Sequence, residues 1–218
     1  MFNRKFTTFN SRTNHSRDVR AHMKKPMRIL IIILTSISLI SCGKDFKIEK
    51  KDFDIVPYEG NEILIFESDK QDRDTIFLVG IENYSTPFGP MELFPDEHEV
   101  YSVKTKRTDP NYDRYLEGKS LIQLVAVEGG ISIEFDIAMK RSWYYGKYTF
   151  GKSEFEKIPL TELNIKEWIY KDVKVIESDG SYEERDNYAE RFYWSVESGF
   201  LGLDRRDEKW RLIKKYVP

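Results

Sequence analysis

Two acidic side chains at alternate positions, Glu134 and Asp136, form the first pair in the sequence that could act together in a reaction. Alternate residues of a β-strand face the same side, about 7 Å apart, and hydrolysis of a glycosidic bond by two carboxylates needs a separation of this order. The same spacing arises on any solvent-exposed strand face that carries acids. The pair therefore favours an outward polar face and leaves a glycan hydrolase open as the alternative.

Other groups that act in catalysis lack suitable neighbours in the sequence. Ser195 and Ser198 do not lie in the Gly-x-Ser-x-Gly turn that exposes a nucleophile. His98 stands between Glu97 and Glu99 ahead of a predicted strand, so we expect a solvated or ion-paired histidine instead of a catalytic base. Phosphate-binding loops and dinucleotide fingerprints are absent from the sequence. These features favour a non-catalytic protein without a cofactor.

Three aspartates, Asp69, Asp72 and Asp74, lie in one predicted turn and could gather a hard cation. Their spacing is not that of an EF-hand, and the turn contains no glycine for a tight bend. The single cysteine and three histidines of the chain leave little material for a zinc site. We therefore expect a charged turn here and no metal.

Aromatic residues offer better material for binding than for catalysis. Trp143, Tyr145 and Tyr148 lie near one end of a predicted hairpin. An exposed row of aromatic rings on a sheet could stack on sugar rings, because such rings combine an apolar face with a polar edge. Aromatic residues at a period of two also fit core positions, and the sequence leaves both interpretations open.

The segment 83–95 is long and apolar for a connection between strands. Long loops of compact domains are often functional or cover one end of the core. The segment therefore predicts either a lid over the open end of the β structure or a surface for a ligand or partner. The candidate surface comprises Phe88, Met91, Phe94, Trp143 and Tyr145.

The charge is distributed unevenly along the chain. Residues 1–42 hold eight basic residues and one acid, which leaves 27 basic and 36 acidic residues and a net charge of −9 for residues 43–218. A negative body repels phosphate backbones, so nucleic acid is not expected as a partner. Residues 29–40 form an apolar run that spans roughly 18 Å as a helix, too short for a hydrocarbon core of roughly 30 Å. With Lys24, Lys25 and Arg28 in front, the run is typical of a secretory signal peptide.

The residues Leu39-Ile40-Ser41-Cys42-Gly43 resemble the lipobox of bacterial lipoproteins. The resemblance implies that Cys42 becomes the first mature residue and carries acyl chains on its sulfur and its amine. Two or more acyl chains hold a protein stably on a bilayer. The exported protein would then be anchored in the bacterial envelope, with the outer membrane as the expected location, facing the periplasm or the cell surface.

The chain divides into four predicted parts. Residues 1–22 are polar and rich in arginine, and we interpret them as an upstream extension because Met23 or Met27 would start an n-region of ordinary length. Residues 23–41 then form the signal peptide, and residues 42–54 form the lipidated cysteine with a charged tether. Residues 55–218 form a single β-rich domain.

A period of two dominates this domain and predicts strands. The connections are too short for helical crossovers, so the expected fold is all-β, an antiparallel β-sandwich or partly open barrel of about nine or ten strands. A short helix fits only at 159–167. In the hairpin 120–140 a two-residue turn at Gly129-Gly130 predicts three pairs on the core face, namely Ile122 with Ile137, Leu124 with Phe135 and Ala126 with Ile133.

Three C-terminal segments, 170–177, 192–201 and Trp210-Arg-Leu212, resemble the C-terminal half of uncharacterised Bacteroidota lipoproteins. In that family a YYSKEYGLI-like strand and turn precede a terminal W-x-L. The resemblance implies an envelope lipoprotein of a Gram-negative bacterium and no particular activity. We therefore expect a lipid-anchored envelope protein that serves as a non-catalytic binding or scaffolding module for a protein or glycan. The alternatives are a surface glycan-binding module or glycan hydrolase, and an inhibitor or immunity protein for a basic partner.

Overall fold

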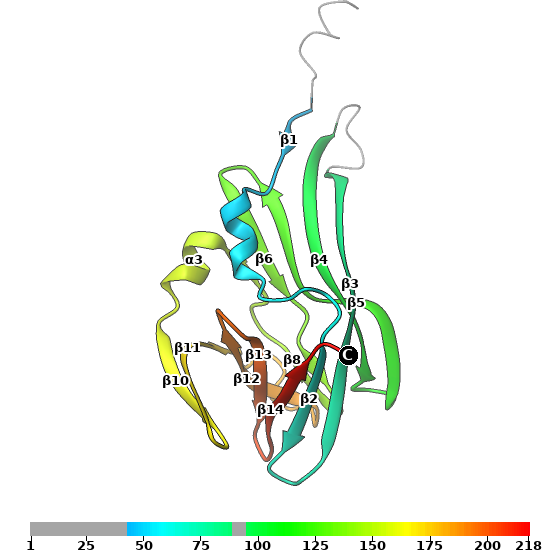
Figure 1. The fold of residues 1–218 in the computed structure, drawn as a ribbon, viewed down its shortest axis with the longest axis vertical. Coiled ribbons are helices and arrows are strands. Elements are labelled where there is room, and N and C mark those ends of the chain that lie inside the picture. The colour runs from blue at the N-terminus through cyan, green and yellow to red at the C-terminus, as the bar shows by residue number, and fades with distance from the viewer. Residues whose placement is uncertain (1–42, 89–94) are drawn as a thin grey trace, which may run out of the picture. The chain divides into compact units, whose positions relative to one another are not determined.

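The computed structural model describes residues 43–88 and 95–218, and these residues form a mainly β fold (Figure 1). Within the described residues, fourteen strands belong to one curled, half-barrel sheet. Eleven of them follow a single path in the order β10-β11-β12-β13-β14-β2-β3-β4-β5-β6-β9. The predicted all-β, partly open barrel is confirmed. The strand number was underestimated because β1, β7, β8 and β9 have only two or three residues and leave no periodic pattern.

The elements have the following bounds. The strands are β1 (Asp45–Phe46), β2 (Ile63–Ser68), β3 (Arg73–Phe88), β4 (Asp96–Asp109), β5 (Arg114–Val127), β6 (Gly130–Phe135), β7 (Ala138–Met139), β8 (Ser142–Tyr144), β9 (Thr149–Gly151), β10 (Leu160–Ile165), β11 (Trp168–Glu177), β12 (Tyr188–Ser195), β13 (Gly199–Arg205) and β14 (Lys209–Tyr216). The 3₁₀ helix η1 covers Lys50–Ile55 and the helix α3 covers Lys152–Lys157.

Two pairings are parallel, which the expected antiparallel arrangement did not include. β8 pairs with Tyr188 and Ala189 of β12, where β12 extends beyond the end of β11. β1 pairs with Glu97 and His98 of β4, beyond the last pair of β4 with β5. In both cases a short segment pairs with a part of the strand that the neighbouring antiparallel strand does not reach. Backbone N–H and C=O groups there gain hydrogen-bond partners, which such groups need when they are buried.

The β5–β6 hairpin has the predicted faces but not the predicted register. Ile122 pairs with Phe135, and the turn residues are Glu128 and Gly129 instead of Gly129 and Gly130. Moving a two-residue turn by one position shifts every pair by two residues. A shift of two keeps each side chain on its face, because side chains alternate. The predicted core residues are accordingly all buried, namely Ile122, Leu124, Ala126, Ile133, Phe135 and Ile137.

The predicted helix at 159–167 is wrong. β10 occupies this segment as an edge strand and pairs with β11 across a turn in which Lys166 has a φ of 53°. Most β10 side chains are exposed, so the segment lacks the alternation that marks a strand. The short helix α3 lies immediately before it.

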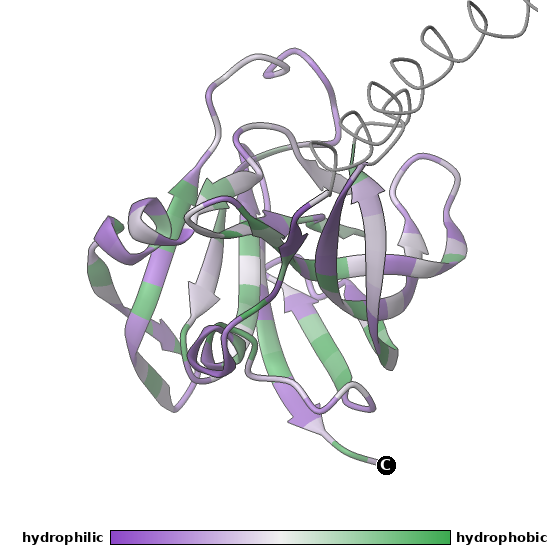
Figure 2. Cartoon of the chain, turned by 90° about the horizontal axis from the view of Figure 1, so that it is seen from above, coloured by the Kyte–Doolittle hydropathy of each residue, from purple (hydrophilic) through white to green (hydrophobic). Residues whose placement is uncertain are grey.

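Helix α3 connects β9 and β10, which are the two end strands of the sheet path (Figure 1). Its Phe155 is buried and lies 5.7 Å from Phe135, measured between ring centroids. Phe135 also contacts Phe192 and Trp194 of β12 at 5.3 and 4.9 Å. The core therefore fills the inside of the curled sheet, and Figure 2 shows hydrophobic residues concentrated along the strands.

Residues 44–54 are not a free tether. β1 pairs with β4, Ile48 is buried, and Phe53 of η1 lies edge-on to Tyr101 at 4.8 Å. Asp52 is buried and pairs with Lys152 of α3 at 2.5 Å. The apolar residues scattered among the charges attach this segment to the sheet, so the β domain begins at Lys44 and not at residue 55.

The described part of the predicted loop at 83–95 is strand up to Phe88. β3 continues to Phe88, which pairs with Asp96 at the start of β4. The side chains of this extension are mostly exposed, so the sequence shows no core pattern there. Met91, Phe94, Cys42 and the predicted signal peptide lie outside the described residues. In the part of the chain that the structure describes, no helix has both the length and the apolar character needed to cross a membrane.

Candidate functional site

β8 places aromatic side chains alternately inside and outside the domain. The backbone N–H of Trp143 donates to the carbonyl of Asn187 at 2.7 Å, which fixes β8 beside β12. The Tyr144 ring turns inward and lies edge-on to Phe192 at 4.8 Å. Strand alternation directs Trp143 to the opposite side of the strand, and the first residue after β8 is Tyr145. Both are half-buried, so the core interpretation of these two residues is replaced by a partly exposed surface.

Trp143 and Tyr145 line a cleft of about 490 Å³, which we call the aromatic cleft. Their rings stack with centroids 6.0 Å apart and planes inclined by 28°. The Tyr182 ring lies 5.1 Å from the Tyr145 ring. The cleft is also lined by Tyr148, Asp179 and Arg185.

Polar contacts hold Tyr145 in position. Its hydroxyl oxygen accepts from Nη1 of Arg185 at 3.2 Å and from Nδ2 of Asn187 at 3.5 Å. The Arg185 guanidinium lies 5.0 Å from the Tyr145 centroid and 4.8 Å from the Tyr182 centroid. Ser178 donates its hydroxyl to the Tyr145 carbonyl. The aromatic surface is thus ordered in advance of any ligand, which lowers the entropic cost of binding.

The sequence identified only part of this cleft. The structure brings Trp143, Tyr145 and Tyr148 together as the spacing indicated. Asp179, Tyr182 and Arg185 were missed because they come from the loop between β11 and β12. Tyr182, an aromatic residue in an otherwise polar stretch, was the available signal. Of the remaining candidate surface residues, Phe88 is 69% exposed but does not line this cleft, and it contacts His98 instead.

Glu134 and Asp136 line a second cavity of about 240 Å³, which shares Phe135, Asp136 and Tyr148 with the aromatic cleft. Both acids are half-buried. Burial raises the pKa of Glu134 above its usual range. Asp136 Oδ2 lies 2.5 Å from Nη2 of the buried Arg107, so this carboxylate compensates a buried positive charge.

The expected environment of His98 is wrong. His98 is buried, and its Nδ1 lies 2.6 Å from the carbonyl oxygen of Ala126. The rings of Phe46 and Phe88 lie 4.8 and 5.0 Å from its ring. β1 pairs with β4 directly at His98 and so places Phe46 beside it, which replaces the expected solvent or acidic partners.

Ser195 is also structural. It is fully buried, and its hydroxyl donates to Asp172 Oδ2 at 2.7 Å. Its oxygen accepts the backbone N–H of Ser198 at 2.8 Å. These bonds stabilise the turn between β12 and β13 and leave the hydroxyl without access to a substrate.

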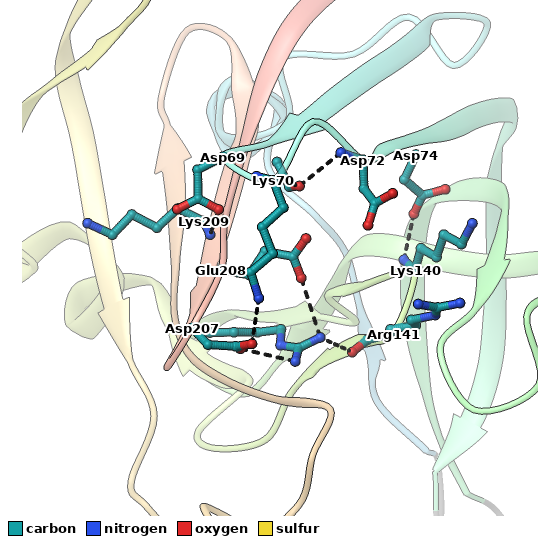
Figure 3. Close-up of polar contacts among 11 residues, drawn as sticks. Asp69, Lys70, Asp72, Asp74, Lys140, Arg141, Asp207, Glu208 and Lys209 are labelled. Atoms are coloured by element: carbon teal, nitrogen blue, oxygen red, sulfur yellow. Dashed lines mark hydrogen bonds and ion pairs between the residues drawn. The ribbon is translucent and has the colours of Figure 1, made fainter.

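The three aspartates of the β2–β3 turn do not converge on one point (Figure 3). Asp69 accepts the backbone N–H of Lys209 at 3.1 Å. Asp74 is buried and accepts the backbone N–H of Lys140 at 2.6 Å and the Thr108 hydroxyl at 3.0 Å. Burial raises the pKa of Asp74, against the effect of these donors. Within residues 43–88 and 95–218, no group of three acidic, histidine or cysteine side chains is placed to hold a metal ion.

These contacts bring together three turns, β2–β3, β7–β8 and β13–β14 (Figure 3). A cavity of about 200 Å³ lies among them, which we call the three-turn cavity. It is lined by Lys70, Asp72, Lys140, Arg141, Arg205, Glu208 and Trp210. The sequence did not predict it, since its members come from segments that are about 70 residues apart in the chain.

No family model matches the chain, and neither curated proteins nor solved structures show a match to it.

Proposed function

We propose that this chain is a lipid-anchored protein of the bacterial envelope that binds a carbohydrate in the aromatic cleft. The observation that carries the proposal is the stack of Trp143 and Tyr145 at the surface, fixed by Arg185 and Asn187. Fixed, partly exposed aromatic rings provide contact area at little conformational cost. Such rings suit the apolar face of a sugar ring.

The polar groups of the cleft complement this surface. Asp179 can accept and Arg185 can donate hydrogen bonds at the same cleft, and their charges cancel. The third charged residue of the lining, Asp136, is paired with Arg107. A cavity of about 490 Å³ lies within the range of roughly 300–1,000 Å³ that is usual for small ligands. An uncharged sugar unit, with hydroxyl groups at its edge and C–H groups on its face, fits this combination.

The anchor is proposed from the N-terminal sequence. The lipobox-like residues around Cys42 follow a short apolar run with basic residues in front. The similarity of the C-terminal segments to Bacteroidota lipoproteins supports the same location. An anchored binding module would hold a glycan or glycoconjugate at the envelope.

Binding can be tested with the full-length protein in detergent on an array of neutral oligosaccharides, followed by calorimetric titration of those that bind. We expect Trp143→Ala to weaken binding at least about tenfold, in line with the loss of a stacked aromatic contact. Trp168→Ala is the matched control, because Trp168 is 63% exposed on β11 and does not line the cleft. The proposal is wrong if no oligosaccharide binds at millimolar concentration, or if both substitutions weaken binding equally.

Hydrolysis of the bound glycan is a second candidate function. Glu134 and Asp136 line a cavity that shares three lining residues with the aromatic cleft. The raised pKa of Glu134 suits a general acid. We expect Glu134→Gln to abolish cleavage of an oligosaccharide that still binds. Chromatography of the bound sugar after incubation tests for cleavage. Recovery of the intact sugar from the unmodified protein would exclude hydrolysis.

A further inference from the structure

Three of the seven buried polar side-chain atoms that have no partner among the described residues belong to residues that line the three-turn cavity. Glu208 is 7% exposed, and its Oε1 has no hydrogen-bond partner within the described part of the chain. The indole Nε1 of Trp210 and the Nε of Arg205 likewise have no partner among the described residues. All three residues line the same cavity. Buried polar groups are nearly always hydrogen-bonded, so these exceptions at one cavity point to a bound molecule that pairs with some of them.

The Glu208 carboxylate points into the space between the three turns (Figure 3). Its Oε2 lies 3.5 Å from Nη1 of Arg205, which leaves Oε1 to accept from another donor. Trp210 Nε1–H is a donor that needs an acceptor. The cavity thus requires a molecule that carries both a donor and an acceptor.

Basic side chains outnumber acidic ones in the lining. Lys70 is paired with Asp207 at 2.6 Å, and Arg205 is paired with the same residue at 3.1 Å. Lys140 has only a distant partner, Asp113, at 3.8 Å, and the Arg141 guanidinium forms no ion pair within residues 43–88 and 95–218. The four basic residues Lys70, Lys140, Arg141 and Arg205 face two lining acids, Asp72 and Glu208. Asp207 and Glu208 already compensate Lys70 and Arg205, so Lys140 and Arg141 are the two lining cations without a close acidic partner. These two cations favour an anion and disfavour a metal ion.

We propose that the three-turn cavity binds a small carboxylate that also carries hydroxyl or amino groups. The carboxylate lies against Arg141 and Lys140 and accepts from Trp210 Nε1, while a hydroxyl or ammonium group donates to Glu208 Oε1. The cavity of about 200 Å³ corresponds to six or seven water molecules at roughly 30 Å³ each, so the ligand is a single sugar acid or amino acid. This site shares no lining residue with the aromatic cleft and is independent of the function proposed for it.

Fluorine NMR of the full-length protein labelled with 5-fluorotryptophan tests the site, because Trp210 is one of only four tryptophans. Trp210→Phe assigns its signal. We expect a saturable shift of that signal with sodium D-glucuronate or with L-serine, and the probe that acts at lower concentration identifies a sugar acid or an amino acid. Glucose lacks the carboxylate and acetate lacks the donor group, so neither should shift the signal at the same concentration.

Two substitutions separate recognition from general electrostatic attraction. Arg141→Asn removes the charge and suits the φ of 56° at this position, and we expect binding at least about tenfold weaker. Lys209→Asn is the control. Lys209 is next to Glu208 in the sequence but does not line the cavity, so removing its positive charge should leave binding unchanged. The proposal is overturned if neither probe shifts the Trp210 signal at millimolar concentration, in which case water alone occupies the cavity. An equal effect of the two substitutions, or a shift with acetate or glucose, overturns it as well.

Discussion

The hydroxyl oxygen of Tyr58 accepts the backbone N–H of Phe200, 142 residues later in the chain, at 2.7 Å. Tyr58 is buried, its ring lies edge-on to Trp194 at 6.0 Å, and burial raises its pKa well above the usual range. The bond connects the segment before β2 to β13. It also explains why residue 199 is a glycine with a φ of 85°, since a Cβ there would lie 2.1 Å from the Tyr58 hydroxyl.

The first prediction concerns this bond. Tyr58→Phe removes the acceptor and leaves a buried N–H unpaired, so we expect the free energy of unfolding to fall by about 1–3 kcal/mol. Urea denaturation measures the change. Tyr112→Phe, at a 71% exposed residue, serves as control and should leave stability unaltered. Equal stability of the Tyr58 variant and the unmodified protein would show that the bond does not contribute.

The second prediction concerns the attachment of residues 44–55 to the β domain. Asp52 and Lys152 form an ion pair at 2.5 Å that joins η1 to α3, with Asp52 almost fully buried. We expect a coupling free energy of about 2 kcal/mol from a double-mutant cycle with Asp52→Asn and Lys152→Met, measured by urea denaturation. The exposed pair Glu49–Lys51 provides the control cycle, for which we expect no measurable coupling. Similar results for the two cycles would contradict a structural role for the pair.

The third prediction concerns pH. Burial raises the pKa of Glu134 above its ordinary value of 4.5. A carboxyl with a higher pKa in the folded state binds its proton more tightly when folded, so its stabilising contribution is complete below 4.5 and is lost as pH rises through the raised pKa. We therefore expect Glu134→Gln to reduce the decline of stability across that window. Urea denaturation at a series of pH values tests this, and Glu117→Gln, at an exposed acid, should reproduce the unmodified profile.

The fourth prediction concerns the proposed anchor. Cys42→Ser removes the thiol that acylation needs, so we expect most of the protein to leave the membrane fraction or to retain its N-terminal segment. Fractionation and intact-mass measurement of the expressed protein provide the test. Ser41→Ala keeps a small residue before the cysteine and should preserve lipidation. Unchanged membrane partitioning of a Cys42 variant that has lost its N-terminal segment would contradict the anchor.

The hairpin of β5 and β6 shows how far sequence patterns reach. Alternation identified the buried face correctly, because any register that differs by two residues buries the same side chains. The turn position was wrong, since Glu128-Gly129 and Gly129-Gly130 both satisfy the same pattern. Edge strands such as β10 escaped detection because an exposed strand does not need apolar alternation.

The sequence by itself determined the β class, the buried faces of the main strands, the acidic character of the body and the lipobox-like motif, because each depends on neighbouring residues. Only the tertiary structure decided that Tyr182 and Arg185 join Trp143 in one cleft, and that Glu208 meets Lys140 at another. Periodicity specifies which face of a strand is buried, and it carries no information on which distant turns meet. Which distant turns meet depends on how the sheet curls around its aromatic core.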